Sequence, residues 1–463
     1  MAKTDWKAEA KALKKKVRKL KDSLTAAAGP VAEAVSGAVS GAVSDVVSAA
    51  KKALKPVTRR VAASFPVLPA IKGAEFAAVE AGVRYQNRKD VMLVRLAPGT
   101  MMAGVFTRSS TRSGCVRDCQ AKLALKVPEG AGAAIIVNSG NSNAFTGKVG
   151  DEAVAAVTGA VAEALGVPAS RVFSSSTGVI GEPMPFERIT AKVPDLIAGL
   201  TEDAVEMAAQ AIMTTDTFPK GAAATLQGEG GVIHISGIAK GSGMIAPDMA
   251  TMLVYIFTDA KIGANQLQKM VSRNVDATFN SITVDSDTST SDTLLIAATG
   301  QSKAAELKGP TLKAFETALA GVMRDLALQV VRDGEGATKL VEVLVTGAAS
   351  DEDAAKVAFA IANSPLVKTA IAGQDPNWGR IVAAIGKSGA EADRDKLTIR
   401  FGDILVAQNG WRNPEYKEDD AAAYMQGQEL VFAVDLGLGK GKRSVWTCDL
   451  TSRYIEINAD YRS

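Results

Sequence analysis

The chain has 463 residues, of which 47% are hydrophobic and 22% are charged, a composition typical of a large globular protein with more than one core. It contains no run of about 18 apolar residues, and its N-terminus lacks the apolar core of a secretory signal. Three cysteines are too few for a disulfide framework, and the pair Cys115 and Cys119 has no nearby histidine to complete a zinc site. We therefore expect a cytoplasmic protein with neither a membrane span nor a metal site.

The first 60 residues differ in charge from the rest of the chain. They carry 14 Lys or Arg and 5 Asp or Glu, a net charge of +9, so residues 61–463 carry a net charge of −6. Residues 34–48 repeat every four residues, and such a period rotates around a helix of about 3.6 residues per turn. We expect residues 1–60 to be a poorly ordered solubility extension, with nucleic-acid or anionic-membrane binding as the alternatives.

From about residue 61, apolar runs and turn signals alternate as in a folded α/β protein. Strands are predicted at 91–96 and 101–107, on either side of a Pro-Gly turn, and at 133–138 before the loop SGNSNAFTG. A helix is predicted over about 151–165, where Gly166 ends it. The pattern then predicts the strand and loop RVFSSSTGVIGEPMP, helices at about 186–200 and 202–213, the loop TTDTFPK and a strand at 231–239.

The second half of the chain continues this alternation. A fully buried strand is predicted directly after Thr251. The later elements are a helix at 264–278, the strand-like segments SITVDSD and TLLIAAT, a helix at about 311–331, the loop RDGEGATK, a strand at 340–346, a helix near 352–363, the loop GQDPNWGR and three closing strands ending in YIEINADYRS. Because strands and helices alternate without a regular βαβ period, we expect a layered α/β sandwich with mixed sheets rather than a Rossmann fold.

The stretch IAPDMATMLVYIF, residues 245–257, places a threonine between a glycine-rich approach and this buried strand. Thr251 fits an ordinary β-branched strand residue, and it equally fits a hydroxyl held at a fixed angle to a pocket. If the Ala250–Thr251 bond is cut, the new α-amino group, with a pKa of roughly 7.7–8, is a general base for the Thr251 hydroxyl. The loop SSSTGVIG offers backbone N–H groups and the Thr177 hydroxyl for an oxyanion hole, although a plain strand-end turn fits it as well.

Other catalytic and nucleotide-binding patterns have little support. The single histidine, His234, lies inside the predicted strand VIHIS, so a Ser-His-Asp mechanism would depend wholly on it. The segment GLGKGKR, residues 437–443, is one residue short of a P-loop and is predicted to be a turn. No G-x-G-x-x-G follows a strand and opens a helix, which argues against a dinucleotide site.

Eight segments, in order along the chain, carry a resemblance to a known family. They are NSGNSNAFTG, SSSTGVIG, MTTDTFPK, AKGSGMIAPDMATML, DSDTSTSDT, DGEGATK, DPNWGR and INADYRS. From about residue 65 to 463, the chain resembles the ornithine acetyltransferase / glutamate N-acetyltransferase family of arginine biosynthesis. Members of that family are self-processing enzymes with an N-terminal threonine nucleophile.

The resemblance implies self-cleavage between Ala250 and Thr251. The products would be an acetyltransferase α chain over 61–250, preceded by the extension 1–60, and a β chain over 251–463 that starts with the catalytic threonine. It also implies that Thr251 takes acetyl from N-acetylornithine and passes it to glutamate through an acetyl-threonine intermediate. No cofactor is implied, and the cleaved chains are expected to assemble as two αβ pairs.

The resemblance implies site residues position by position. The oxyanion hole falls on Thr177 and Gly178. From side-chain charge we expect Lys240 to hold a carboxylate and Glu335 an ammonium. The implied substrate-contacting residues are Thr214, Lys240, Thr251, Glu335, Asn458 and Ser463.

Three positions depart from the family pattern, and some alternatives stay open. Phe145 stands where many members have cysteine, Asp248 replaces a frequent asparagine, and Ser463 ends the chain where threonine is common. Acetyl-CoA is a possible second acetyl donor, as in the bifunctional members of the family. An aminopeptidase or amidohydrolase with the same nucleophile, and a non-enzymatic scaffold whose basic arm binds nucleic acid or membrane, are the rival interpretations.

Overall fold

The structure is a computed structural model that describes residues 64–246 and 252–459. The predictions for residues 1–60, for Ala250 and Thr251 and for Ser463 lie outside these ranges. In the described part of the chain, no helix has the length and apolar content needed to cross a membrane.

The first sheet has four strands and one helical face. Its strand order is β1-β2-β4-β5, with β4 and β5 parallel and the other pairs antiparallel. Alternating side chains of the sheet pack on α4, α5 and α6, because successive residues of a strand point to opposite faces. The bounds are β1 (Ala74–Val79), β2 (Val91–Leu96), β4 (Ala133–Asn141), β5 (Val172–Val179), α4 (Gly147–Leu165), α5 (Phe186–Thr190) and α6 (Val193–Ala198).

The second sheet has five strands in the order β3-β9-β8-β7-β6, with β8 and β9 parallel and the other pairs antiparallel. Every residue of its central strand β8 is buried. Two long helices, α8 and α9, pack on one face of this sheet. The bounds are β3 (Met101–Phe106), β6 (Lys220–Gly228), β7 (Gly231–Lys240), β8 (Leu253–Thr258), β9 (Thr293–Ala298), α8 (Ala264–Asn274) and α9 (Gly309–Arg332).

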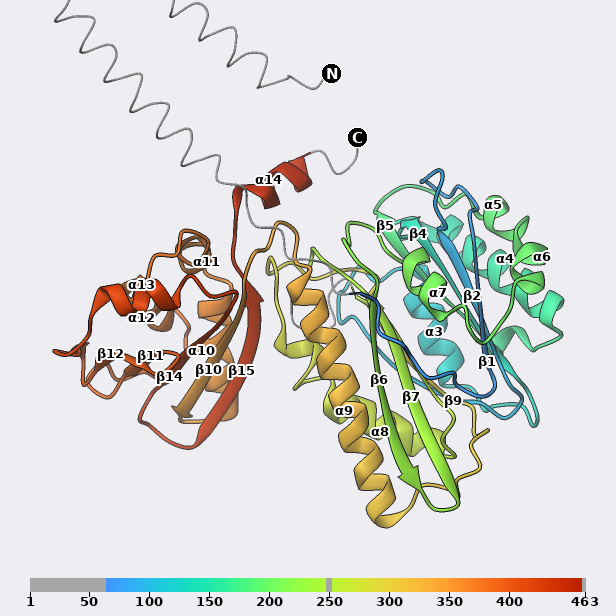
Figure 1. Cartoon of the computed structure of the whole chain (residues 1–463). Helices are drawn as coiled ribbons and strands as arrows, with labels where there is room; N and C mark the ends of the chain where they lie inside the picture. The colour runs from blue at the N-terminus through green and yellow to red at the C-terminus, as the bar shows by residue number, and fades with distance from the viewer. Residues whose placement is uncertain (1–63, 247–251, 460–463) are drawn as a thin grey trace, which may run out of the picture. The chain divides into compact units, whose positions relative to one another are not determined.

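These two sheets pack face to face and form a four-layer arrangement. On β8, Leu253, Tyr255 and Phe257 join the core between the sheets, together with side chains from β1, β2 and β4. Val254 and Ile256, one residue out of phase, join the core under α8 and α9. The order of layers is therefore helices, first sheet, second sheet, helices (Figure 1).

A third sheet follows in the sequence and has its own core. Its order is β13-β12-β11-β14-β10-β15, in which only the pair β10 and β14 is parallel. Four helices, α10 to α13, cover it. The bounds are β10 (Leu340–Ala348), β11 (Thr398–Phe401), β12 (Ile404–Gln408), β13 (Trp411–Arg412), β14 (Glu429–Asp435), β15 (Gly441–Cys448), α10 (Asp351–Ala362), α11 (Pro365–Ala372), α12 (Trp378–Gly386) and α13 (Glu418–Tyr424).

The predicted layered α/β sandwich with mixed sheets is confirmed, as is the strand around His234. In GLGKGKR, residues 437–440 connect β14 to β15, but residues 441–443 already belong to β15. The strands β1 and β6 and the helices α3 (Gly114–Leu123), α11, α12 and α13 were not predicted, and α12 begins inside GQDPNWGR, which was predicted to be a loop. One helix was predicted over 186–200, where α5 and α6 are separate. A strand was predicted at SITVDSD, residues 281–287, but there only Ile282 makes an isolated β-bridge, to Trp446. The predicted helix over 202–213 is α7 (Val205–Ala211).

The predicted closing strand at YIEIN is wrong, because this segment is the helix α14 (Ser452–Ala459). Its alternation of apolar and polar residues suggested a strand, but no strand pairs with it in the described chain. The polar contacts instead follow the helical repeat. Tyr454 and Asn458, four residues apart, lie on one face of α14 and both donate to carboxylates across a cavity.

Candidate active site

One cavity of ≈ 380 Å³ brings together segments that lie far apart in the sequence. They are the end of β5, the loop after α7, the end of β7, the loop before β9, the loop after α9, and α14. The described residues that the sequence analysis assigned to the site all line it: Thr177, Gly178, Thr214, Lys240, Glu335 and Asn458.

The end of β5 presents Thr177 and Gly178 to the cavity at a distortion of the sheet. The β4–β5 register shifts at Gly140 and Asn141, opposite these two residues. Gly178 has φ +132°, and a Cβ atom there would lie 2.3 Å from the carbonyl carbon of Gly140. Only glycine fits this close approach of two backbones, so the geometry of the predicted oxyanion loop depends on it.

Lys240 ends β7 with its ammonium inside the cavity wall. Its Nζ donates to Thr214 Oγ1 at 2.7 Å and to Thr177 Oγ1 at 3.4 Å, so it contacts both the predicted oxyanion residue and a predicted substrate contact. The side chain is 2% exposed. Burial lowers the pKa of the Lys240 ammonium, and the nearby Asp216 carboxylate offsets only part of that effect.

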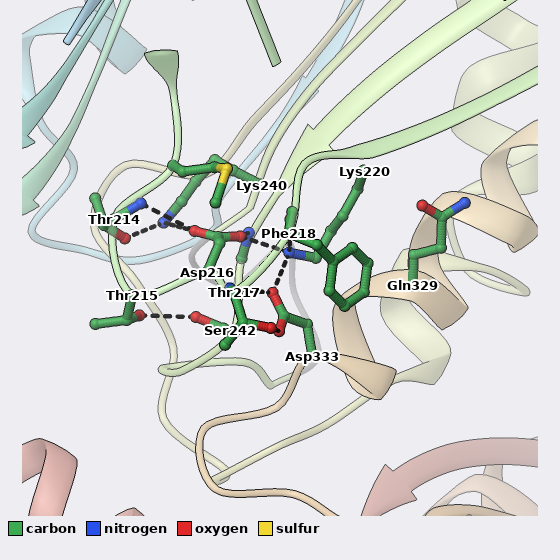
Figure 2. Close-up of polar contacts among 12 residues, drawn as sticks. Thr214, Thr215, Asp216, Thr217, Phe218, Lys220, Lys240, Ser242, Gln329 and Asp333 are labelled. Atoms are coloured by element: carbon green, nitrogen blue, oxygen red, sulfur yellow. Dashed lines mark hydrogen bonds and ion pairs between the residues drawn. The ribbon is translucent and has the colours of Figure 1, made fainter. Parts of the chain in front are cut away.

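Behind Lys240 lies a buried set of charged side chains (Figure 2). Lys220 Nζ lies 2.6 Å from Asp216 Oδ1 and 2.6 Å from Asp333 Oδ2. Asp333 also accepts from the Thr217 amide at 2.9 Å. Burial alone would raise the pKa of Asp216, but Lys220 and Lys240 hold it below its usual value.

Carboxylates also line the cavity. Glu335, in the loop after α9, accepts from Asn458 Nδ2 at 2.7 Å, and its own amide donates to the Ser242 carbonyl. Asp285 accepts from the Met244 amide at 2.6 Å and from the Tyr454 hydroxyl at 3.0 Å. A cation at Lys240 and carboxylates in the same cavity suit a substrate that carries both charges, such as an amino acid.

The described chain resumes at Met252, the residue after the predicted nucleophile. The Met252 amide donates to Asp292 Oδ1 at 2.8 Å, and its carbonyl accepts from Thr293. Leu253 then pairs with Lys240 at the start of β8. Burial holds the pKa of Asp292 well above its ordinary value, although the Met252 amide opposes that shift.

Several residues at or behind the cavity were given no role by the sequence analysis. They lie in segments predicted to be loops or strands, where a single aspartate, lysine or tyrosine carries no distinguishing signal. These residues are Asp216, Lys220, Asp285, Asp292, Asp333 and Tyr454. Phe145, noted as a departure from the family pattern, is 80% exposed and does not line this cavity.

Comparison with known proteins places the chain in a family. A sequence model of the ArgJ family matches residues 75–463. The arginine biosynthesis bifunctional protein ArgJ of Ruegeria pomeroyi is 67% identical over 401 residues, which cover 87% of this chain and 97% of that protein. Its counterpart in Rhizobium meliloti is 52% identical, covering 86% of this chain and 97% of that protein.

Among solved structures, the ArgJ protein of Bacillus halodurans is 44% identical, covers 44% of this chain and 97% of that chain, and gives a TM-score of 0.43. The match of the family model and the identity of the relatives show that the chain belongs to the ArgJ family. The family resemblance drawn from the eight sequence segments is therefore confirmed.

Proposed function

We propose that this protein transfers an acetyl group from N-acetylornithine to glutamate in arginine biosynthesis, through an acetyl ester on Thr251. The relatives' names, which describe bifunctional proteins of arginine biosynthesis, support this assignment. The observation that carries it is a single cavity lined by Thr177, Gly178, several carboxylates and Lys240, whose Nζ lies 3.4 Å from Thr177 Oγ1. Such a cavity provides oxyanion donors and partners for both charges of an amino acid.

The proposed reaction begins with self-cleavage at Ala250–Thr251. The freed α-amino group takes the proton of the Thr251 hydroxyl as the oxygen attacks the acetyl carbonyl of N-acetylornithine. Thr177 and the backbone at Gly178 stabilise the oxyanion. The carbon–nitrogen bond then breaks, and ornithine leaves with the proton. The neutral amine of glutamate then attacks the acetyl carbon, the bond from that carbon to the Thr251 oxygen breaks, and N-acetylglutamate leaves. The proton lost by the amine passes through the α-amino group to the Thr251 oxygen, which restores the free hydroxyl.

The remaining features of the proposal concern donor, assembly and compartment. We propose that acetyl-CoA serves as a second acetyl donor and that no cofactor takes part, because the threonine and its amine supply the nucleophile and the base. Residues 1–60 are proposed to be an extension, 61–250 the α chain and 251–463 the β chain, with two of each assembled. The three buried free cysteines suit the reducing cytoplasm.

Mass spectrometry of the purified protein tests the proposal. Under denaturing conditions, we expect a β chain that starts at Thr251, and a Thr251→Ala variant that stays one full-length, inactive chain, whereas Thr251→Ser still cuts. Incubation with N-acetylornithine alone should add one acetyl group to the β chain and release ornithine. Glutamate should then remove the label as N-acetylglutamate.

Three outcomes would contradict the proposal. Cleavage in the Thr251→Ala variant would exclude autolysis by this hydroxyl. A β chain of unchanged mass under rapid quench, with intersecting-line kinetics, would indicate direct transfer in a ternary complex. Acetate release that does not depend on glutamate would instead identify a hydrolase with the same nucleophile.

A further inference from the structure

Two buried lysines, Lys220 and Lys240, form ion pairs with the Asp216 carboxylate, and only Lys220 lies within hydrogen-bond distance of it. Asp216 Oδ1 accepts from Lys220 Nζ at 2.6 Å and from the Gly241 amide at 2.6 Å. Asp216 Oδ2 accepts from the Thr214 amide at 3.0 Å, while Lys240 Nζ stays 3.8 Å away. Three donors therefore hydrogen-bond to Asp216, and Lys240 is not one of them, because 3.8 Å exceeds normal hydrogen-bond length.

Lys220 is held in this place from two sides. Its Nζ bridges Asp216 and Asp333 at 2.6 Å each, and it also reaches the Phe218 carbonyl at 3.4 Å (Figure 2). Burial lowers the pKa of the Lys220 ammonium, but the two carboxylates outweigh burial and raise it. Lys220 is therefore a fixed cation with no exposed surface, and it does not line the cavity.

We propose that Lys220 competes with Lys240 for Asp216 and, as a positioning residue, keeps the Lys240 ammonium directed at the cavity through Thr214 and Thr177. Without this competition, the Lys240–Asp216 ion pair would close from 3.8 Å to hydrogen-bond distance, because both groups are buried beside each other. A closed pair would draw the ammonium away from the Thr214 hydroxyl, which it now contacts at 2.7 Å.

The same arrangement sets how firmly Lys240 holds its proton. The charged groups that act on it are Asp216, Glu335 and Asp292, which favour the ammonium, and Lys220, which disfavours it. Lys220 thus opposes the ammonium directly and also occupies the nearest carboxylate. Removing Lys220 should make Lys240 harder to deprotonate, and removing Asp216 should make it easier.

The opposite shifts expected for the proton affinity of Lys240 in the two variants can be tested with cyanate. Cyanate adds only to neutral amines, so the rate at which Lys240 is carbamylated across a pH series, followed by peptide mass spectrometry, reports its proton affinity without any substrate. In Lys220→Met, the midpoint should rise by about one pH unit or more, and in Asp216→Asn it should fall by a similar amount. If Lys220→Met does not fold, the double variant Lys220→Met/Asp333→Asn removes one charge of each sign and serves the same purpose.

A matched control separates positioning from general stability. Lys368 is also a buried lysine, but it bonds to the Thr447 hydroxyl and the Cys448 carbonyl and does not line the cavity. Lys368→Met should lower thermal stability and leave the Lys240 midpoint unchanged. An unmoved midpoint in the Lys220 variants, or a shift in the same direction for Lys220→Met and Asp216→Asn, would overturn the inference.

A kinetic arm rests on the proposed function. The alkaline limb of kcat/KM for acetyl transfer should move up in Lys220→Met even though kcat/KM at neutral pH falls roughly tenfold to a hundredfold. If the alkaline limb of kcat/KM did not shift while the carbamylation midpoint of Lys240 did, Lys220 would have no role in acetyl transfer. If the wild-type protein transferred no acetyl group, the proposed function would fail while the cyanate result still decided the competition between the two lysines.

Discussion

Glu335 accepts a hydrogen bond from Asn458 at 2.7 Å, although 123 residues separate them in the sequence. The contact joins the loop after α9 to the helix α14 across the cavity. Glu335 is 8% exposed and also abuts Gly243, where an added Cβ would lie 2.5 Å from its carboxylate. Its charge therefore faces the cavity in a fixed position.

Replacing Glu335 with glutamine should test that charge with little change of shape. Glutamine can still accept from Asn458, but it cannot hold an ammonium by charge. A hydrogen bond to a charged group contributes about 1.5–3 kcal/mol, so KM for N-acetylornithine should rise roughly tenfold to a hundredfold. Initial-rate kinetics measure this KM, with the Asn458→Ala variant as the comparison. An unchanged KM would remove Glu335 from substrate binding.

Thr177→Ala should slow the chemical step more than it weakens substrate binding. Loss of one oxyanion donor typically lowers kcat about 100- to 1,000-fold. Steady-state kinetics at saturating substrate measure the loss, and Thr177→Ser, which keeps the hydroxyl, should recover most of it. A change confined to KM would mean that this residue only binds substrate.

Gly178→Ala should destabilise the fold as well as the predicted oxyanion loop. The new Cβ would meet the Gly140 carbonyl carbon at 2.3 Å, and φ is +132°. Gly181 offers a matched control, because its φ is +83° and no atom lies within 4 Å of an added Cβ. In urea unfolding, Gly181→Ala should lose about 1–2 kcal/mol and Gly178→Ala distinctly more. Equal losses would show that the close approach is not rigid.

Asp285→Asn should weaken the turn that leads into the predicted cleavage segment. Asp285 accepts from the Met244 amide at 2.6 Å and the Ile245 amide at 2.9 Å. We expect slower self-cleavage in a time course on denaturing gels. Tyr454→Phe, which removes only the 3.0 Å hydroxyl contact to Asp285, should cleave at a rate much closer to wild type. Equal cleavage rates in the wild type, Asp285→Asn and Tyr454→Phe would show that Asp285 does not contribute to self-cleavage.

Deletion of residues 1–60 should leave both cleavage and acetyl transfer intact. The match to the family begins at residue 75, and the deletion removes a net charge of +9. We expect unchanged kcat/KM and a lower isoelectric point. A truncated protein that folds, as judged by circular dichroism, yet transfers no acetyl group would refute this independence.

The sequence predicted regular elements well where burial follows a simple period. The strand after Thr251 reads as a continuous apolar run because β8 is buried on both faces, between the first sheet and the helices α8 and α9. The same reasoning misled at YIEIN, where apolar and polar residues alternate as in a strand. That segment is the helix α14, and its side chains Tyr454 and Asn458 donate hydrogen bonds to the carboxylates of Asp285 and Glu335, which are far away in the sequence.

By itself, the sequence determined the family, the mixed α/β class and the residue types available for chemistry, because ordered segments and apolar periods are local properties of the chain. Only the tertiary structure decided which of two buried lysines hydrogen-bonds to Asp216. That choice depends on Asp333, which is 113 residues from Lys220 and is brought beside it by the packing of α9 on the second sheet. Charges interact through space, and their distances are set by the fold.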